Sequence, residues 1–300
     1  MSIARHACAI DRHSTTLAGI EYEPSTGFTV TECRTLRAGL EDFSGAGTLR
    51  FVKKLGALFR KNAVETLTLC FHSPALFPLD TVVSPAISRD ALETHCRAEA
   101  SRLLTSPERY RHDDLPYAPD NEEDPLQRRL LLYYPGNIPE TLRKNLDPIC
   151  RIEGCSHYLK PMLLSAIASG KPFVILVLEP EYASLAAGSG RGLDYFRHWP
   201  TRHESDAEYF SVRELLLLDR RHRTSPVYAT GSLSANGSLI EKITNGTGKT
   251  VLPYDLAELF PLTGGNRSSK QGPSTVELRA IGTAMQEILR LRGAAEAEPF

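Results

Sequence analysis

The chain has 300 residues, of which 41% are hydrophobic and 8% aromatic, with 35 basic and 36 acidic side chains. This composition is typical of a globular protein with one large or two medium-sized domains, and it excludes disordered, collagen-like and membrane-embedded classes. Residues 1–160 carry 20 basic and 21 acidic side chains, and residues 161–300 carry 15 of each. Because a nucleic-acid-binding protein normally has a basic excess, we expect no nucleic-acid partner.

The cysteines and the N-terminus indicate a reducing compartment. The closest cysteine pair, Cys150 and Cys155, leaves no CxxC motif for a zinc or dithiol site. Others lie in apolar runs such as residues 67–71, where a free thiol packs as a small hydrophobic group. No stretch has the length of a signal peptide or a membrane span. We therefore expect a cytoplasmic protein that does not insert into a membrane.

The N-terminal part of the chain predicts three strands, a helix and a fourth strand. Segments rich in β-branched and aromatic residues, separated by turns, cover residues 6–11, 15–23 and 28–33. Across residues 49–59, apolar side chains recur at helical spacing between lysines and arginines. Residues 64–71 predict the fourth strand.

The second half of the chain repeats this order. Strands are predicted at residues 173–178, 182–187 and 193–199, a helix at residues 206–219 and another strand at residues 227–231. The two units begin roughly 165 residues apart, which indicates duplication of one fold.

The segment between the two units has no counterpart in the second half. It predicts a strand at residues 76–83 and a helix capped by Ser88. Residues 113–124 hold six acidic side chains and two prolines, which is typical of a solvated loop. The remaining predicted elements are a strand at residues 128–134, helices at residues 139–146 and 158–169, and a C-terminal helix opened by a capping box at residues 274–277 and ended by Gly293.

Two glycine-rich segments imitate nucleotide-binding loops. Residues 245–250 resemble the end of a phosphate-binding loop, but its first glycine is missing and Pro253 follows instead of a helix. Gly188, Gly190 and Gly192 precede an aromatic strand, which favours a hairpin turn. The nine histidines show no catalytic or metal-binding spacing. We therefore predict no catalytic residue and no metal site.

The duplicated order with its inserted segment resembles the actin/hexokinase superfamily, which is built from two ribonuclease H-like domains. Within it, the chain is similar over nearly its whole length to the PilM family of type IV pilus assembly proteins and to the cytoplasmic domain of GspL. Asp11 and the hydroxyl residues after it stand where this family has its first phosphate loop. Residues 230–232 stand where an adenosine loop is expected, and residues 280–284 resemble the closing helix. Residues 64–85, with the helix that Ser88 caps, resemble the family's subdomain of paired strands followed by a helix.

The resemblance implies an α/β fold with mixed sheets, made of two ribonuclease H-like β-β-β-α-β-α domains in an actin/hexokinase-like arrangement. The first domain would cover residues 1–165, with an inserted subdomain at about 74–127, and the smaller second domain would cover residues 166–300. It also implies a vestigial nucleotide cleft. The residues expected to line that cleft are Asp11, Ser14, Thr15, Thr16, Glu179, Gly231 and Ser232.

The phosphate loops depart from the family pattern. His13 stands where a glycine would let the backbone approach a phosphate. The second loop has Glu179, Pro180 and Glu181 in place of an Asp-x-Gly-x-x-x-Thr pattern. Carboxylates repel phosphate unless a metal intervenes, and proline removes an amide donor. We therefore expect no cofactor, with ATP and magnesium disfavoured.

These departures favour a non-catalytic actin-like scaffold, a cytoplasmic component of a type IV pilus or type II secretion inner-membrane assembly. The resemblance implies a protein partner, a short cytoplasmic peptide of a membrane protein, which would hold the scaffold at the inner membrane. The alternative is an active ATP-binding protein or sugar-kinase-like phosphotransferase. In that case Asp11 and Glu179 would hold a metal. Ser14, Thr15 and Thr16, together with Gly231, would hold the phosphate and the base. A nuclease would need more converging carboxylates than these two.

Overall fold

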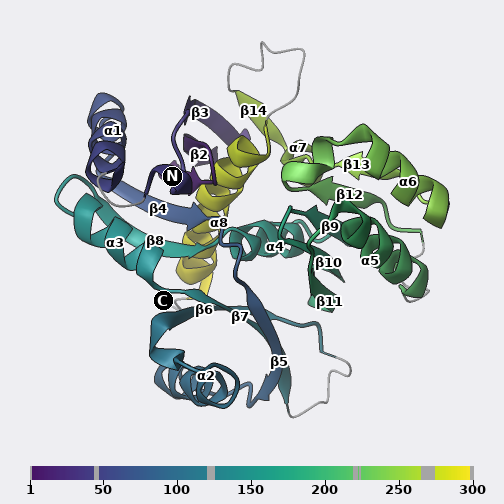
Figure 1. Ribbon diagram of the computed structural model, residues 1–300. Helices are drawn as coiled ribbons and strands as arrows, with labels where there is room; N and C mark the ends of the chain where they lie inside the picture. Colours follow the sequence, from purple (N-terminus) through teal and green to yellow (C-terminus); the bar gives the residue numbers. More distant parts are fainter. Residues whose placement is uncertain are drawn as a thin grey trace.

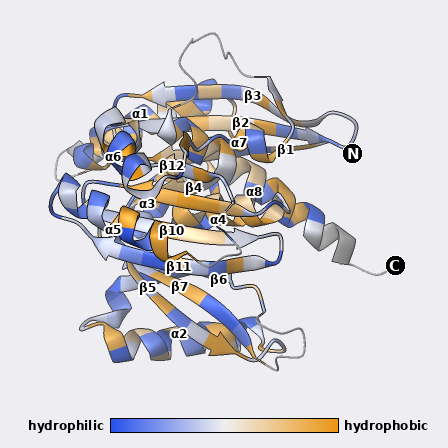
Figure 2. Ribbon diagram, turned by 90° about the vertical axis from the view of Figure 1, so that its right-hand side faces the viewer, coloured by the Kyte–Doolittle hydropathy of each residue, from blue (hydrophilic) through white to orange (hydrophobic). Residues whose placement is uncertain are grey.

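Two mixed β-sheets with the same strand order form the body of the protein, and a smaller sheet is attached to the first (Figure 1). The computed structural model describes residues 2–43, 47–119, 126–218, 222, 224–264 and 274–297. Hydrophobic residues gather on the central strands of the sheets (Figure 2). Among the described residues, no helix is both long enough and apolar enough to span a bilayer.

The first sheet has six strands. Three form an antiparallel meander, two run parallel to the first of these, and a short strand extends the outer edge. In spatial order they are β14 (Leu262–Gly264), β3 (Gly27–Leu36), β2 (Thr15–Glu23), β1 (Ile3–Ile10), β4 (Thr66–Phe71) and β8 (Arg151–His157). The four strands predicted in this unit are present, and β8 and β14 are additions that the sequence pattern did not indicate.

The second sheet repeats the order of the first, again with three antiparallel strands followed by two parallel ones. Its strands are β11 (Gly192–Pro200), β10 (Tyr182–Ser189), β9 (Phe173–Leu178), β12 (Val227–Thr230) and β13 (Val251–Pro253). β9 is buried along its whole length, as its unbroken apolar sequence requires. The matching strand orders confirm the predicted fold class of two ribonuclease H-like units.

The third sheet lies beside the first and has the strand order β5–β7–β6. Its elements are β5 (Phe77–Val83), β6 (Tyr110–Pro116), β7 (Gln127–Pro135) and the helix α2 (Arg89–Leu103). Ser88 caps α2 by accepting a hydrogen bond from the amide of Ala91 at 3.2 Å, as predicted. Cys96 and Ala100 pack against Leu131 and Tyr133 in a separate small core.

The predicted acidic loop at residues 113–124 is wrong in its first part, because residues 113–116 belong to β6. Asp113 is buried there, accepts the amide hydrogen of His157 at 2.7 Å and lies 3.5 Å from the ammonium of Lys160. A buried carboxylate is tolerated when it is paired in this way. Residues 120–125 of the predicted loop lie outside the described residues.

Helices cover both large sheets. They are α1 (Gly47–Lys61), α3 (Asn137–Leu146), α4 (Leu159–Ala168), α5 (Glu204–Leu217), α6 (Gly237–Thr247), α7 (Leu256–Leu259) and α8 (Thr275–Ala297). α8 packs on β1, β2 and β4 and also on α4, which contacts β10 of the second sheet. These two helices therefore lie in the middle of the molecule, between the large sheets (Figure 1).

The ends of the C-terminal helix show one confirmed prediction and one error. The capping box is present, since the amide of Ser274 donates to Glu277 Oε2 at 2.7 Å and the amide of Glu277 donates to Ser274 Oγ at 3.4 Å. The predicted end at Gly293 is wrong, because α8 continues to residue 297. A glycine costs a helix only about 1 kcal/mol, so it does not by itself end one.

Both glycine-rich segments form turns, as predicted. Gly248 ends α6 in the left-handed conformation, with φ of 66°, and β13 follows. Gly190 lies in the hairpin that joins β10 to β11. The boundary predicted between residues 165 and 166 falls inside α4 and stays a prediction.

Candidate functional site

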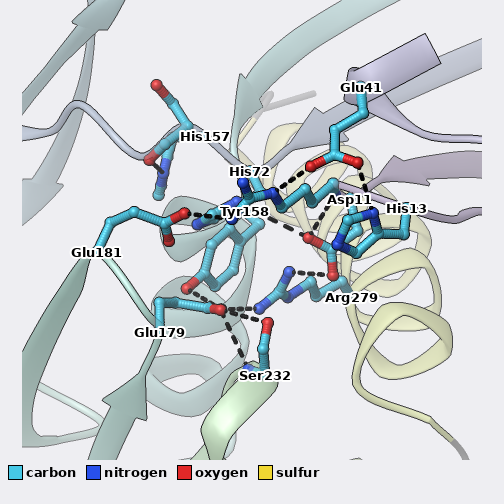
Figure 3. A network of polar contacts seen from close by, with 12 residues as sticks. Asp11, His13, Glu41, His72, His157, Tyr158, Glu179, Glu181, Ser232 and Arg279 are labelled. Atoms are coloured by element: carbon cyan, nitrogen blue, oxygen red, sulfur yellow. Dashed lines mark hydrogen bonds and ion pairs between the residues drawn. The ribbon is translucent and has the colours of Figure 1, made fainter. Parts of the chain in front are cut away.

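The candidate site lies where equivalent strands of the two large sheets end. Asp11 directly follows β1, and Glu179 directly follows β9. The side chain of Arg279, from α8, lies between these carboxylates (Figure 3). Its Nη1 is 2.9 Å from Asp11 Oδ2, and its Nη2 donates a short hydrogen bond to Glu179 Oε1. One guanidinium therefore bridges carboxylates that belong to the two sheets.

Glu179 is completely buried, yet its carboxylate has four hydrogen-bond donors. Besides Arg279, the hydroxyl of Tyr158 donates to Oε1 at 3.1 Å, and Ser232 donates to Oε2 from its amide at 3.1 Å and its hydroxyl at 2.6 Å. Burial alone would raise the pKa of Glu179, but Arg279 and the other donors outweigh it and hold that pKa below its usual value. Glu179 is thus an ionised, fully paired structural group.

The side chains of Tyr158 and Tyr182 complete the surroundings of Arg279. Its Cζ atom lies 3.7 Å from the centre of the Tyr158 ring, close enough for a cation–π interaction. The hydroxyls of Tyr158 and Tyr182 share a hydrogen bond of 2.8 Å. Arg279 itself is only 7% exposed. The guanidinium is therefore held by two ion pairs and a ring rather than by solvent.

Two histidines, the buried His72 and the half-buried His198, contact these tyrosine rings. His72 lies between the rings of Tyr158 and Tyr182, with both ring centres 5.8 Å away, and its Nδ1 is 3.8 Å from Asp11 Oδ1. His198 Nδ1 shares a hydrogen bond of 2.8 Å with the hydroxyl of Ser184. Burial lowers the pKa of His72, and it lowers the pKa of His198 to about 4.

The low pKa of His198 predicts acid destabilisation. The unfolded chain takes up a proton near pH 6.5, whereas the folded protein does so near pH 4, so stability falls as the pH drops through this window. At pH 5 this histidine lowers the free energy of unfolding by roughly 2 kcal/mol. His198→Asn keeps an amide near the position of Nδ1 but does not titrate. Urea unfolding should show that the free energy of unfolding changes less between pH 7 and pH 5 in this variant than in the unmodified protein.

The matched control for this prediction is His13→Asn, since the side chain of His13 is 70% exposed. We expect its difference in unfolding free energy between pH 7 and pH 5 to equal that of the unmodified protein. Equal pH dependence of all three proteins would contradict a role of the half-buried His198.

A second set of ion pairs links the loops outside the buried network (Figure 3). Arg12 donates from Nε to Glu41 at 2.6 Å and from Nη1 to Glu181 at 2.9 Å. His13 Nδ1 lies 2.9 Å from the other oxygen of Glu41. Arg12 therefore connects the loop after β1 to the loop after β9, although its half-exposed side chain makes this link weaker than that of Arg279.

A small cavity adjoins the network. A cavity of about 10 Å³ adjoins Arg279, lined also by Thr230, Tyr254 and Gly282, which is room for one water molecule. The residues do not fit magnesium-bound ATP, because a guanidinium already pairs with both carboxylates that a metal would need. Glu181, on the second loop, would add a further negative charge against phosphate.

The structure brings together four of the seven residues predicted to line a nucleotide cleft. Asp11 and Glu179 share Arg279, and Ser232 binds Glu179 directly after Gly231. Gly231 has a φ of 102°, a left-handed backbone region that favours glycine.

The hydroxyl residues after Asp11 have other partners. Thr15 and Thr16 are fully buried at the start of β2. Thr15 Oγ1 donates to the carbonyl oxygen of Ala38 at 2.7 Å, and Thr16 Oγ1 shares a hydrogen bond of 2.8 Å with Thr35. The carbonyl oxygen of Ser14 accepts the amide hydrogen of Asp11 at 2.8 Å. The two threonine hydroxyls therefore bond to residues at the end of β3 and just after it, and they do not bond to the Arg279 network.

Sequence reasoning missed Arg279 and Tyr158, the residues that complete the network. A signal for Arg279 exists, because the first half of α8 is apolar on nearly all sides. A helix of that kind is buried all round, so a charge within it must have a buried partner.

Comparison with known proteins shows similarity in structure but not in sequence. No family model matches the chain, and no curated protein matches it. The PilM–PilN type IV pilus biogenesis complex superposes with a TM-score of 0.65 and 14% identity, covering 98% of this chain and 99% of that chain. A Bacteroides thetaiotaomicron protein with an actin-like ATPase fold and unknown function has a TM-score of 0.47 and 9% identity, covering 93% and 96%.

A third structure is the cytoplasmic domain of EpsL, an inner-membrane component of the type II secretion system of Vibrio cholerae. It has a TM-score of 0.47 and 7% identity, covering 96% of this chain and 95% of that chain. The strand order of the two large sheets and the full-length superposition on PilM agree. The chain has the actin-like fold, and its structure is similar to that of PilM over its whole length.

Proposed function

We propose that this protein is a non-catalytic scaffold with an actin-like fold, which binds a protein partner without needing a nucleotide. The observation that carries this proposal is Arg279, whose buried guanidinium pairs with Asp11 and Glu179 at the same time. These are the two carboxylates that an active enzyme of this fold would use to hold a metal. One guanidinium already bridges both of them, so the two sheets are joined without metal or phosphate.

The proposed setting is a type IV pilus or type II secretion assembly at the cytoplasmic face of the inner membrane. The similarity to PilM supports it, because that protein was solved in complex with PilN, a second pilus biogenesis protein. We propose a protein partner for this chain, namely a short cytoplasmic peptide of a membrane protein. This partner would bring the scaffold to the membrane.

The first test is nucleotide binding. Magnesium-bound ATP at about 1 mM should leave the melting temperature unchanged. If ATP did bind, a concentration of a hundred times the dissociation constant would stabilise the folded protein by about 2.7 kcal/mol and raise the melting temperature by several degrees. Magnesium chloride alone is the control. A shift of several degrees that Asp11→Ala abolishes would overturn the nucleotide-independent part of the proposal and favour the ATP-binding alternative.

The second test is partner binding. Fluorescent peptides should cover the N-terminal cytoplasmic segments of the inner-membrane proteins encoded beside this gene, with scrambled peptides as controls. We expect one peptide to raise the fluorescence polarisation equally with and without magnesium-bound ATP. If none of the peptides binds, or if the neighbouring genes encode no pilus or secretion component, the proposed setting is wrong.

A further inference from the structure

The outward face of α1 carries only positive charge. Its apolar residues Phe51, Leu55 and Phe59 are buried in the main core. The remaining positions include five basic side chains and no acidic one, and none of the five has an ion pair with the described residues. These exposed side chains are Arg50, Lys53, Lys54, Arg60 and Lys61.

More arginines gather next to α1. The helix packs beside α3, whose last turn carries Arg143 (Figure 1). Arg143 lines an open hollow of about 720 Å³ together with Arg5, Arg151 and Arg290, and with the carboxylates Asp147 and Glu153. Arg290 already pairs with Glu287 on its own helix.

Three of these arginines have no carboxylate partner among the described residues. In that part of the chain, no ion pair involves Arg5, Arg143 or Arg151. The Nε of Arg5 is buried and has no hydrogen-bond acceptor among those residues. Guanidinium groups that have no carboxylate partner make the hollow suited to an anionic group that enters from outside. We call these three arginines and the five basic residues of α1 the basic face.

We propose that the basic face binds anionic phospholipid headgroups at a membrane surface. The arginines of the hollow can form paired hydrogen bonds with a phosphate group, and the lysines of α1 add attraction over a wider area. The exposed apolar side chain of Leu49 favours a lipid over another kind of anionic partner. It is 65% exposed at the start of α1, beside Arg50 and one helical turn from Lys53. An apolar side chain among cations fits the boundary between headgroups and acyl chains.

This proposal goes beyond the scaffold function and does not depend on it. A scaffold at an inner-membrane assembly could bind its protein partner without any affinity for lipid. It could equally bind lipid without binding that partner. The charge of α1 is hidden in the composition, because the first half of the chain as a whole has nearly equal numbers of basic and acidic residues. Vesicle binding and peptide binding are therefore separate experiments with separate outcomes.

The test is sedimentation of the full chain with vesicles of phosphatidylglycerol and phosphatidylcholine in equal parts, in about 100 mM salt. We expect binding to these vesicles and none to pure phosphatidylcholine. Lys53→Glu combined with Lys54→Glu should weaken binding at least about tenfold, since each basic residue near an anionic surface contributes separately. Leu49→Ser, which leaves the charge unchanged, should weaken it severalfold.

The matched control reverses two exposed basic residues of the third sheet's subdomain, Arg89→Glu with Arg109→Glu. This control should bind vesicles within about twofold of the unmodified chain, although its net charge equals that of the α1 variant. Circular dichroism melting should show that all variants are folded. Equal weakening by both double variants would overturn the proposal, because only net charge would then matter.

Two further outcomes would also overturn it. Binding to polyglutamate but not to the anionic vesicles would mean that the ligand of the basic face is an acidic protein segment and not a lipid. Complete displacement from the vesicles by a few millimolar pyrophosphate, at constant ionic strength, would assign the hollow to a soluble phosphate compound instead of a headgroup.

Discussion

Replacing Arg279 by alanine should destabilise the protein by about 3–5 kcal/mol, the usual cost of removing one partner from a buried ion pair. Glu179, which is fully buried, would lose its cationic partner, and Asp11 would lose the link to the second sheet. Urea unfolding at pH 7, followed by circular dichroism, measures the change in unfolding free energy.

Arg290→Ala is the matched control for this experiment. Arg290 lies on the same helix, but its side chain is 59% exposed and its pair with Glu287 spans one helical turn. Pairs of this kind contribute less than about 1 kcal/mol. Similar losses for Arg279→Ala and Arg290→Ala would mean that the buried network does not hold the sheets together.

Adding Glu179→Gln to Arg279→Ala separates the ion pair from the packing of the arginine. Glutamine is close in shape to glutamate and carries no charge to leave unpaired. The double variant should therefore be more stable than Arg279→Ala alone. If it is less stable, the uncompensated charge of Glu179 is not the cause of the loss.

Gly231→Ala should destabilise the protein by about 2–4 kcal/mol. The φ of Gly231 is 102°, and a Cβ atom there would overlap the carbonyl oxygen of Leu178, which is backbone and cannot rotate away. The substitution would also displace Ser232 from Glu179. Urea unfolding provides the measurement.

Gly237→Ala serves as the control for Gly231→Ala. Gly237 has no left-handed φ, and a Cβ atom added to it at the start of α6 would have no neighbouring atom within 4 Å. We expect this variant to be as stable as the unmodified protein or slightly more stable, because alanine restricts the unfolded chain. An equal loss at both positions would show that the special conformation of Gly231 is unimportant.

Elements with a strong local pattern could be predicted from the sequence. β9 has an unbroken apolar sequence between turn residues, and its predicted and observed bounds agree. β2 agrees equally well, because Thr15–Glu23 is rich in residues that favour strands. The duplication followed from the repeat of such segments, which is insensitive to errors at single boundaries.

Other elements depend on distant partners. β8 has the sequence RIEGCSH, which contains a glycine and charged residues and forms a strand because β4 pairs with it. β6 contains Asp113 and Asp114, which local rules assign to a loop. Their charges are balanced by Lys160, which lies 3.5 Å from Asp113 and 3.6 Å from Asp114 across the fold.

The candidate site could be predicted only in part, for the same reason. Asp11 and Glu179 were found because each follows a recognisable strand in equivalent positions of the repeat. Arg279 was missed because its partners are far away in the sequence, 268 residues for Asp11 and 100 for Glu179. Nothing in a local pattern places a helix from the end of the chain between two loops.

The sequence by itself determined the duplicated fold and the even charge of each half, because these depend on the order of residue types along the chain. Only the tertiary structure decided that Arg279 bridges Asp11 and Glu179, and that Arg5, Arg143, Arg151 and Arg290 line one hollow. Electrostatic interactions depend on distance in space, and folding brings together charges that are separated by up to the whole length of the chain.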